Sequence, residues 1–242
     1  FHGINLMFNG DLDGYAWGGS AYITLDGVTK SWPMTWEPPW GYENVAVIAH
    51  EMGHSFSLHH SSNYETLTGY PYNNRWDVMS DTWGNCIYGV NDDATYGCLG
   101  QHTISYHKDK LGWIPAGQKF TPTLGSNAFF ILERLALPTN GNYKMVQIPI
   151  NGSSTNFYTV EVRKKVGYDS ILPYDSVIIH EVNTSRSEEA LVQGSNGGVG
   201  AVRTPGNVFR VTSNDSNAAN EISVSVVYAT STGYAIHVAY GQ

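Results

Sequence analysis

The stretch HEMGH, residues 50–54, places two histidines four positions apart with a glutamate directly after the first. On an α-helix, residues four apart lie on the same face, with Cβ atoms about 5–6 Å from each other. Two neutral imidazoles at that spacing can bind one Zn²⁺ ion. Glu51 follows His50, so its side chain points aside from the ligand face. The pattern therefore predicts that His50 and His54 are metal ligands and that Glu51 is a base for a metal-bound water.

A catalytic zinc site needs a third protein ligand and an open coordination position. Two further histidines, His59 and His60, follow shortly after the motif in the stretch SFSLHH. Either imidazole can reach the metal only if the helix ends soon after His54 and the chain turns back. The spacing alone leaves both histidines as candidates for the third ligand.

The helix that must carry the motif is predicted to begin near Glu43 or Asn44. Pro38 and Pro39 are expected to prevent a helix before residue 43. Apolar residues then recur at spacings of three and four positions and define one stripe, formed by Val45, Ile48, Met52 and Phe56. The motif histidines are offset from this stripe by about half a turn. We therefore expect one face to pack on a core and the imidazoles to face a cleft.

Strand-like runs surround this helix. Residues 4–8 and 20–25 precede it, and from residue 116 onward β-branched and aromatic runs alternate with Gly, Asn, Pro and Ser turns. The last two runs, ISVSVVYAT and YAIHVAY, are separated by STG and predict a terminal hairpin. The sequence thus predicts an α+β catalytic domain over residues 1–115 and an all-β sandwich domain over residues 116–242.

Composition narrows the class of partner. The formal net charge is −8 and no basic run occurs, which argues against nucleic acid. No apolar run approaches the length of a transmembrane helix. We therefore expect no membrane span, and the sequence makes no prediction of oligomeric state.

Several features favour a secreted protein. Cys86 and Cys98 lie close together in a segment rich in Gly, Asn and Asp, which predicts one disulfide in an oxidising compartment; two unrelated buried thiols are the alternative. Glycosylation sequons occur at Asn151, Asn183 and Asn214. The chain starts at Phe1 without a signal peptide, so we expect a mature or truncated product.

The segment from Asn9 to Gly14 matches the opening of a calcium-binding loop, N-x-D-x-D-G, with Asp11 and Asp13 as further ligands. Ser20 stands where an EF-hand requires a bidentate glutamate, which excludes that motif. A smaller Ca²⁺ site remains a secondary prediction, and a solvated turn is favoured over it.

The longer stretch HEMGHSFSLHH resembles the extended metzincin motif HExxHxxGxxH, and this resemblance favours His60 over His59 as the third ligand. The family places glycine at the turn before the third histidine, where this chain has Ser57. Serine can adopt the left-handed conformation at a cost of about 1 kcal/mol. Met79, within RWDVMSD, resembles the methionine that metzincins carry in a tight turn beneath the zinc.

A third similarity, after the histidine motif and Met79, indicates a subgroup of the metzincins. The segment QHTISYHKDKLGWIP, residues 101–115, resembles the helix and Lys-x-x-Leu-Gly-Trp element of gametolysin-like and immune-inhibitor-type secreted metallopeptidases, and residues 158–173 resemble the start of their β-domain. The resemblance implies a zincin-type fold and a secreted metalloendopeptidase with one catalytic Zn²⁺. It also implies hydrolysis of protein or peptide substrates by Glu51-assisted attack of zinc-bound water. Such domains usually have more chain before the motif, so part of the amino-terminal subdomain is expected to be missing or cleaved.

Some metzincins use a tyrosine two positions past the methionine to stabilise the oxyanion, but this chain has Asp81 there. Tyr64 and Tyr106 are both candidates for that role. Substrate is expected to extend along an edge strand over residues 19–25. Two other functions compete with general proteolysis: a glycan- or protein-binding module with a structural metal, and a peptidase restricted to glycoproteins.

Overall fold

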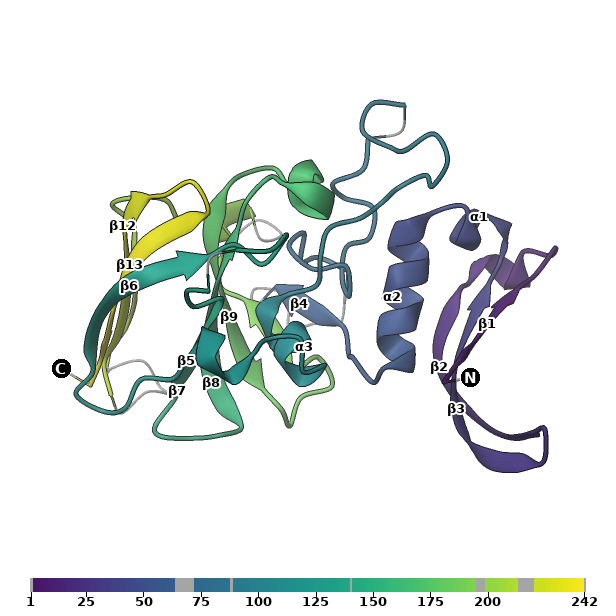
Figure 1. Cartoon of the computed structure of the whole chain (residues 1–242), viewed down its shortest axis with the longest axis horizontal. Helices are drawn as coiled ribbons and strands as arrows, with labels where there is room; N and C mark the ends of the chain where they lie inside the picture. The colour runs from purple at the N-terminus through teal and green to yellow at the C-terminus, as the bar shows by residue number, and fades with distance from the viewer. Residues whose placement is uncertain are drawn as a thin grey trace.

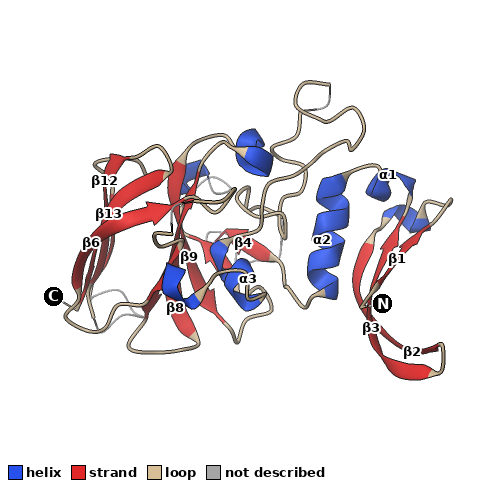
Figure 2. Cartoon of the chain, viewed as in Figure 1, coloured by secondary structure: helices blue, strands red, loops and turns tan. Residues whose placement is uncertain are grey.

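The computed structural model describes residues 2–63, 72–87, 89–139, 141–194, 199–212 and 220–241. Strands predominate over helices in the described residues, and they form three sheets (Figure 2). The longest described helix, α2 (Val45–Ser55), stands between the three-stranded sheet on one side and the two larger sheets on the other (Figure 1). The two ends of the chain lie at opposite ends of the molecule.

The amino-terminal sheet has the strand order β1-β3-β2. Its strands are β1 (Ile4–Met7), β2 (Trp17–Leu25) and β3 (Val28–Glu37), and a short 3-10 helix, η1 (Leu12–Gly14), connects the first two. The strands expected at residues 4–8 and 20–25 are confirmed. The third strand was not predicted, because Pro33 lies within it. Pro33 is tolerated since β1 pairs only from Met34 onward, so β3 has one unpaired side at the proline.

A one-turn helix, α1 (Pro39–Tyr42), precedes α2. The expectation that the prolines prevent any helix before residue 43 was therefore wrong. Pro39 occupies the first turn, where its missing N–H would have no helical partner and its fixed φ suits the helix. Asn44 is the N-cap residue of α2, which agrees with the predicted start of that helix.

The buried face of α2 differs from the predicted apolar stripe. The predicted stripe residues are only partly buried, and Phe56 is 46% exposed. The residues that are buried are Ala46, Val47, His50, Glu51 and Gly53. This correction has a simple cause: α2 packs closely against β2 and β3 on one side and the turn at Met79 on the other, and small or polar residues fill those contacts.

The remaining two sheets form a sandwich. The six-stranded sheet has the order β4-β10-β9-β8-β7-β5, and the four-stranded sheet has the order β11-β12-β13-β6. Their strands are β4 (Ser61–Asn63), β5 (Lys119–Phe120), β6 (Asn127–Glu133), β7 (Met145–Pro149), β8 (Asn156–Arg163), β9 (Ser176–Asn183), β10 (Ala190–Val192), β11 (Val208–Val211), β12 (Ile222–Ala229) and β13 (Gly233–Tyr240). One core joins the sheets, with Val160 and Ile179 from the first meeting Val224 and Ile236 from the second.

The predicted terminal hairpin is confirmed as the antiparallel pair β12–β13. The helical elements of this half are α3 (Ser105–Lys110), η3 (Ala116–Gln118), η4 (Gly167–Ile171) and η5 (Val199–Ala201). Helix α3 ends at the Lys-Leu-Gly-Trp element, where Gly112 has a φ of +73°. No described helix is long and apolar enough to cross a bilayer.

One strand of the first predicted domain, residues 1–115, belongs to a sheet of the second, residues 116–242. β4 comes from the first segment of the chain but pairs in parallel with β10, so that Ser61 lies opposite Ala190. Residue 60 is thus fixed directly beside the six-stranded sheet. The two predicted domains share a sheet, and the division at residue 116 stays a prediction.

The predicted disulfide joins Cys86 to Cys98, whose Cα atoms lie 5.9 Å apart. Cys98 also contacts the start of α2, because its carbonyl oxygen accepts a hydrogen bond from the N–H of Ala46 at 2.8 Å. The disulfide therefore fixes the segment that supports the first turn of α2.

Candidate metal centre

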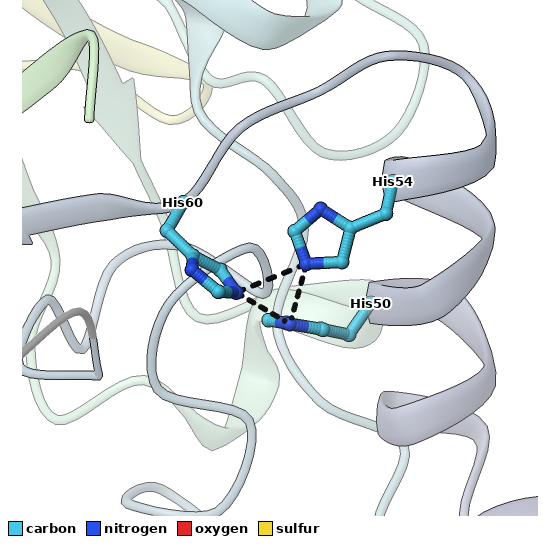
Figure 3. Close-up of side chains that lie close together, drawn as sticks. All are labelled: His50, His54 and His60. Carbon is cyan, nitrogen blue, oxygen red and sulfur yellow. Dashed lines mark hydrogen bonds between the residues drawn. The ribbon is translucent and has the colours of Figure 1, made fainter. Parts of the chain in front are cut away.

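Three imidazoles converge at the carboxyl-terminal half of α2 (Figure 3). His50 and His54 project from successive turns of the helix, and His60 reaches back from the segment that leads into β4. The Nε2 atom of His50 lies 3.1 Å from that of His54 and 3.1 Å from that of His60; the third separation, His54 to His60, is 2.9 Å. It is His60, and not His59, that completes the group.

Backbone carbonyls orient two of these rings. Nδ1 of His50 lies 2.7 Å from the carbonyl oxygen of Val78, and Nδ1 of His54 lies 2.9 Å from that of Leu58. A carbonyl only accepts, so each Nδ1 carries the proton and each Nε2 keeps its lone pair toward the centre. This arrangement, with one nitrogen anchored and the other free, is typical of histidine metal ligands.

The turn between the second and third histidines uses the predicted left-handed residue. Ser57 has a φ of +65°, so serine occupies the position where the extended motif has glycine. The N–H of Leu58 donates to the carbonyl of Gly53 at 3.0 Å, which closes the turn. His59 points elsewhere: its side chain is 49% exposed and its Nδ1 lies 3.8 Å from a carboxylate oxygen of Glu189.

Burial keeps the three imidazoles neutral. It lowers the pKa of His50 to about 4 and that of His60 to about 3, and it also lowers the pKa of His54. The rings are therefore unprotonated near neutral pH and can act as ligands. Three nitrogens bound tetrahedrally to Zn²⁺ at 2.0–2.1 Å lie about 3.3–3.4 Å apart, close to the separations found here. The residues fit a zinc ion with one open coordination position.

Glu51 lies beside this group, 8% exposed. Burial, followed by the nearby charge of Glu37, raises the pKa of Glu51 to about 7, while a hydrogen bond from the backbone of Gly18 opposes the shift. A carboxyl group with a pKa near 7 is suited to both accept and return a proton at neutral pH. Glu51 is thus a buried carboxyl group beside the three imidazoles, and its role as a base stays a prediction.

Met79 lies directly under α2. It is fully buried, in a turn where its N–H donates to Asp77 Oδ1 at 3.0 Å. A Cβ atom added to Gly53 would come within 2.1 Å of the Met79 sulfur, so the thioether packs against the helix between the turns that carry the two motif histidines. Met79 therefore packs against the helix that carries His50 and His54, and its role as a metzincin-type methionine stays a prediction.

Two hollows meet at the histidine group, and both are lined by Ala16, His50, Glu51 and Tyr72. One, of about 550 Å³, extends toward aromatic residues and the segment after Met79; the other, of about 480 Å³, extends along β2 past Trp17 and Gly18. No described Lys or Arg lines either hollow. Trp17 and Gly18, at the start of β2, flank the site, and β2 is an edge of its sheet. Residues 19–25, the predicted substrate-binding edge, line neither hollow, and their role stays a prediction.

The sequence analysis did not identify Tyr72 as a residue of the site. Its ring centroid lies 5.0 Å from that of His60 and 6.1 Å from that of His50, and the residue is 45% exposed. The candidate Tyr106 is buried elsewhere, with its hydroxyl donating to Glu189 at 2.8 Å. Tyr64, the other candidate, lies outside the described residues. No spacing rule singles out Tyr72, because it follows His60 through a segment with several tyrosines.

The remaining predicted positions are Asp81, the calcium loop and the sequons. Asp81 lines the larger hollow, and its Oδ1 accepts hydrogen bonds from the N–H groups of Trp83 and Gly84. In the predicted calcium loop, Asp11 Oδ1 accepts a hydrogen bond from the Trp40 indole at 2.8 Å. The histidine trio is the one group of three or more metal-binding His, Cys, Asp or Glu side chains found in the described part of the chain. The Asn214 sequon lies outside the described residues.

Comparison with known proteins adds no relative: no family model, no curated protein and no solved structure matches this chain.

Proposed function

We propose that the protein is a secreted zinc-dependent metalloendopeptidase of the metzincin type. The observation that carries this proposal is the convergence of three neutral imidazoles, with the buried carboxyl group of Glu51 beside them, at the meeting point of two open hollows. The resemblance of HEMGHSFSLHH and of the segment around Met79 to metzincin motifs supports the same assignment.

Each residue has a definite task in this proposal. His50, His54 and His60 would hold a zinc ion, which when bound would supply a Lewis acid to polarise the peptide carbonyl and lower the pKa of water. Glu51 accepts the proton of the attacking water and then delivers it to the leaving amine. The backbone N–H of Gly18 and the packing around α2 hold Glu51 in place. Tyr72 borders both hollows beside the metal ligands, where it can contact the substrate at the scissile bond.

The open edge of β2 offers a binding surface for an extended peptide. Backbone groups of an edge strand can pair with a substrate backbone, and the hollows on either side of the metal ligands can hold its side chains. This supports a protein or peptide substrate that crosses the site from one hollow to the other. Secretion is supported by the Cys86–Cys98 disulfide, which forms in oxidising compartments.

The number of ligands favours catalysis over a structural metal. Structural zinc sites are closed by four protein ligands, whereas catalytic sites have three and one open position. The described His, Cys, Asp and Glu side chains supply three ligands at this centre. This favours the peptidase over a binding module with a structural metal.

The two adjacent histidines provide a matched test. The zinc-loaded protein is incubated with a mixed peptide library, and products and zinc content are measured by mass spectrometry. We expect chelator-sensitive cleavage, loss of zinc and cleavage in His60→Ala, and retention of both in His59→Ala. Cleavage that survives complete removal of the metal would contradict the proposal. Stoichiometric zinc without cleavage of plain or glycosylated peptides would favour the binding module.

A further inference from the structure

A fully buried carboxylate, that of Asp77, lies at the centre of the segments that surround the metal ligands. Its Oδ2 accepts a hydrogen bond from the Ser61 hydroxyl at 2.7 Å, and its Oδ1 accepts one from the Thr103 hydroxyl at 2.8 Å. The N–H of Met79 donates to Oδ1 at 3.0 Å. Nδ1 of His107 lies 3.2 Å from Oδ2. Asp77, Ser61, Met79 and His107 are all fully buried.

These contacts connect separate parts of the metal centre. Ser61 follows His60 directly and is the first residue of β4. Val78, the residue after Asp77, provides the carbonyl that accepts the Nδ1 proton of His50 at 2.7 Å. One carboxylate therefore fixes both the backbone beside the third ligand and the turn that orients the first.

The sandwich holds the same segment from its other side. The Nη1 group of Arg163, from β8, donates to the carbonyl oxygen of Trp76, next to Asp77. Asn74 Nδ2 donates to Ser61 Oγ at 3.0 Å, and Nε2 of His180, from β9, lies 3.1 Å from the same nitrogen. Asp77 thus lies between the segment that carries His60 and the six-stranded sheet, and contacts on both sides hold it in place.

We propose that Asp77 is a positioning residue for the metal centre, which locks the loop bearing His60 to the turn that orients His50. This inference rests on the proposed metal site, but it does not depend on the reaction catalysed there. Replacing a residue that holds a metal ligand in place through hydrogen bonds typically lowers metal affinity by about 10–100-fold.

The charge of Asp77 has a second effect on the site. Burial opposes its ionisation, but the charge of His107 and the hydrogen bonds from His107, Ser61 and Met79 outweigh burial, and the pKa of Asp77 lies below its ordinary value. Asp77 is therefore an anion at neutral pH. A buried anion at this place favours a bound cation.

Two hydroxyl donors to the same carboxylate allow a matched test. Ser61→Ala removes the contact on the side of the ligand loop, and Thr103→Val removes the contact on the side of α3. Each change deletes one hydrogen bond to Asp77. We expect Ser61→Ala and Asp77→Asn to weaken Zn²⁺ binding about 10-fold or more, measured by competition with a chromophoric chelator. Thr103→Val is expected to stay within about twofold of the unmodified protein, because Thr103 does not adjoin a ligand.

Cobalt substitution separates positioning from general stability. The visible absorption of Co²⁺ reports the arrangement of its ligands, so we expect an altered spectrum for Asp77→Asn at full saturation. Glu133→Gln, which changes a fully buried carboxylate of β6 in the sandwich, should leave the cobalt spectrum and the zinc affinity unchanged. Equal zinc affinities for Ser61→Ala and Thr103→Val, or an unchanged cobalt spectrum in Asp77→Asn, would overturn the proposal. If Asp77→Asn does not fold, the Ser61 and Thr103 pair decides.

Discussion

Glu37 is a buried carboxyl group close enough to Glu51 to influence its charge. It is fully buried, and a contact with the Thr35 side chain only partly offsets the effect of burial on its charge. Burial raises the pKa of Glu37 to about 7. Because the unfolded value is 4.5, the native state binds a proton more tightly than the unfolded state does.

The sign of the resulting pH dependence follows from that shift. The contribution of Glu37 to stability is fully present below pH 4.5 and is lost as the pH rises through about 7, because the unfolded state then ionises more readily. The loss amounts to about 3 kcal/mol. We predict that Glu37→Gln removes this pH-dependent contribution. The difference in the free energy of unfolding between the variant and the unmodified protein should therefore change by about 3 kcal/mol between pH 4.5 and about pH 7.

Urea unfolding of both proteins at a series of pH values, with the metal state held constant, measures this difference. Subtracting one profile from the other removes the contribution of the histidines, which titrate in both proteins. Glu181→Gln, which changes a partly exposed carboxylate paired with Arg186, provides the control for removal of one carboxylate at another place in the chain. Parallel profiles for Glu37→Gln and the unmodified protein would contradict the account.

At the residue scale, the sequence predicted which histidines converge, because the pattern of a histidine metal site depends on residue type and spacing. His50, His54 and His60 meet as expected, and Ser57 adopts the left-handed conformation that the turn demands. Tyr72 could not be found in this way. Its place depends on how the chain folds between His60 and Met79, for which no local pattern exists.

At the scale of elements, the contact between β2 and α2 determines where Glu51 lies. A Cβ atom added to Gly18 would come within 1.8 Å of the Glu51 carbonyl oxygen, and the contact involves backbone on the helix side. Gly19, the next residue on the strand, has nothing within 4 Å of an added Cβ atom. Gly18 and Gly19 are neighbours on β2, but only Gly18 is packed against α2.

We predict that Gly18→Ala displaces β2 from α2 and lowers the free energy of unfolding by about 1–3 kcal/mol, the usual range for overpacking. Peptide cleavage should fall with it, because the strand that supports Glu51 and borders the substrate site has moved. Gly19→Ala should change neither quantity appreciably. Chemical denaturation and cleavage rates of both variants provide the measurement. Equal effects of the two substitutions would show that the close approach of β2 to α2 is unimportant.

The sequence predicted the elements unequally for physical reasons. Helix α2 and hairpin β12–β13 were predicted, because a motif on a periodic segment and two strand-like runs around a tight turn are local signals. The buried face of α2 was not, since it depends on how closely β2 and the Met79 turn approach the helix. β3 was missed because the tolerance of Pro33 depends on the length of β1, a partner distant in sequence.

At the scale of the whole molecule, the sandwich and the candidate metal centre are physically joined through β4. This strand follows His60 and pairs with β10, and Ser62 within it donates a hydrogen bond to Glu188. The sequence predicted two consecutive domains because the composition changes near residue 116. A strand of three residues with the sequence SSN carries no strand signal, so its pairing with the distant β10 could not be predicted.

We predict that metal removal loosens the sandwich locally. Hydrogen exchange should accelerate in α2 and β4 when zinc is removed, and also in β10, because β10 pairs with β4. The β12–β13 hairpin lies in the other sheet and serves as the internal reference, with little change expected. Acceleration confined to α2 would contradict the coupling of the sandwich to the metal centre.

The most direct test of the central claim compares Glu51→Gln with the unmodified protein at equal zinc occupancy. The carboxamide retains the size of the side chain but cannot accept a proton from water. We expect about one zinc per chain in both proteins and a peptide-cleavage rate at least about 100-fold lower in the variant, the range typical for loss of a general base. Equal cleavage rates in the two zinc-loaded proteins would contradict the assigned role of Glu51, and the absence of cleavage in both would contradict the peptidase itself.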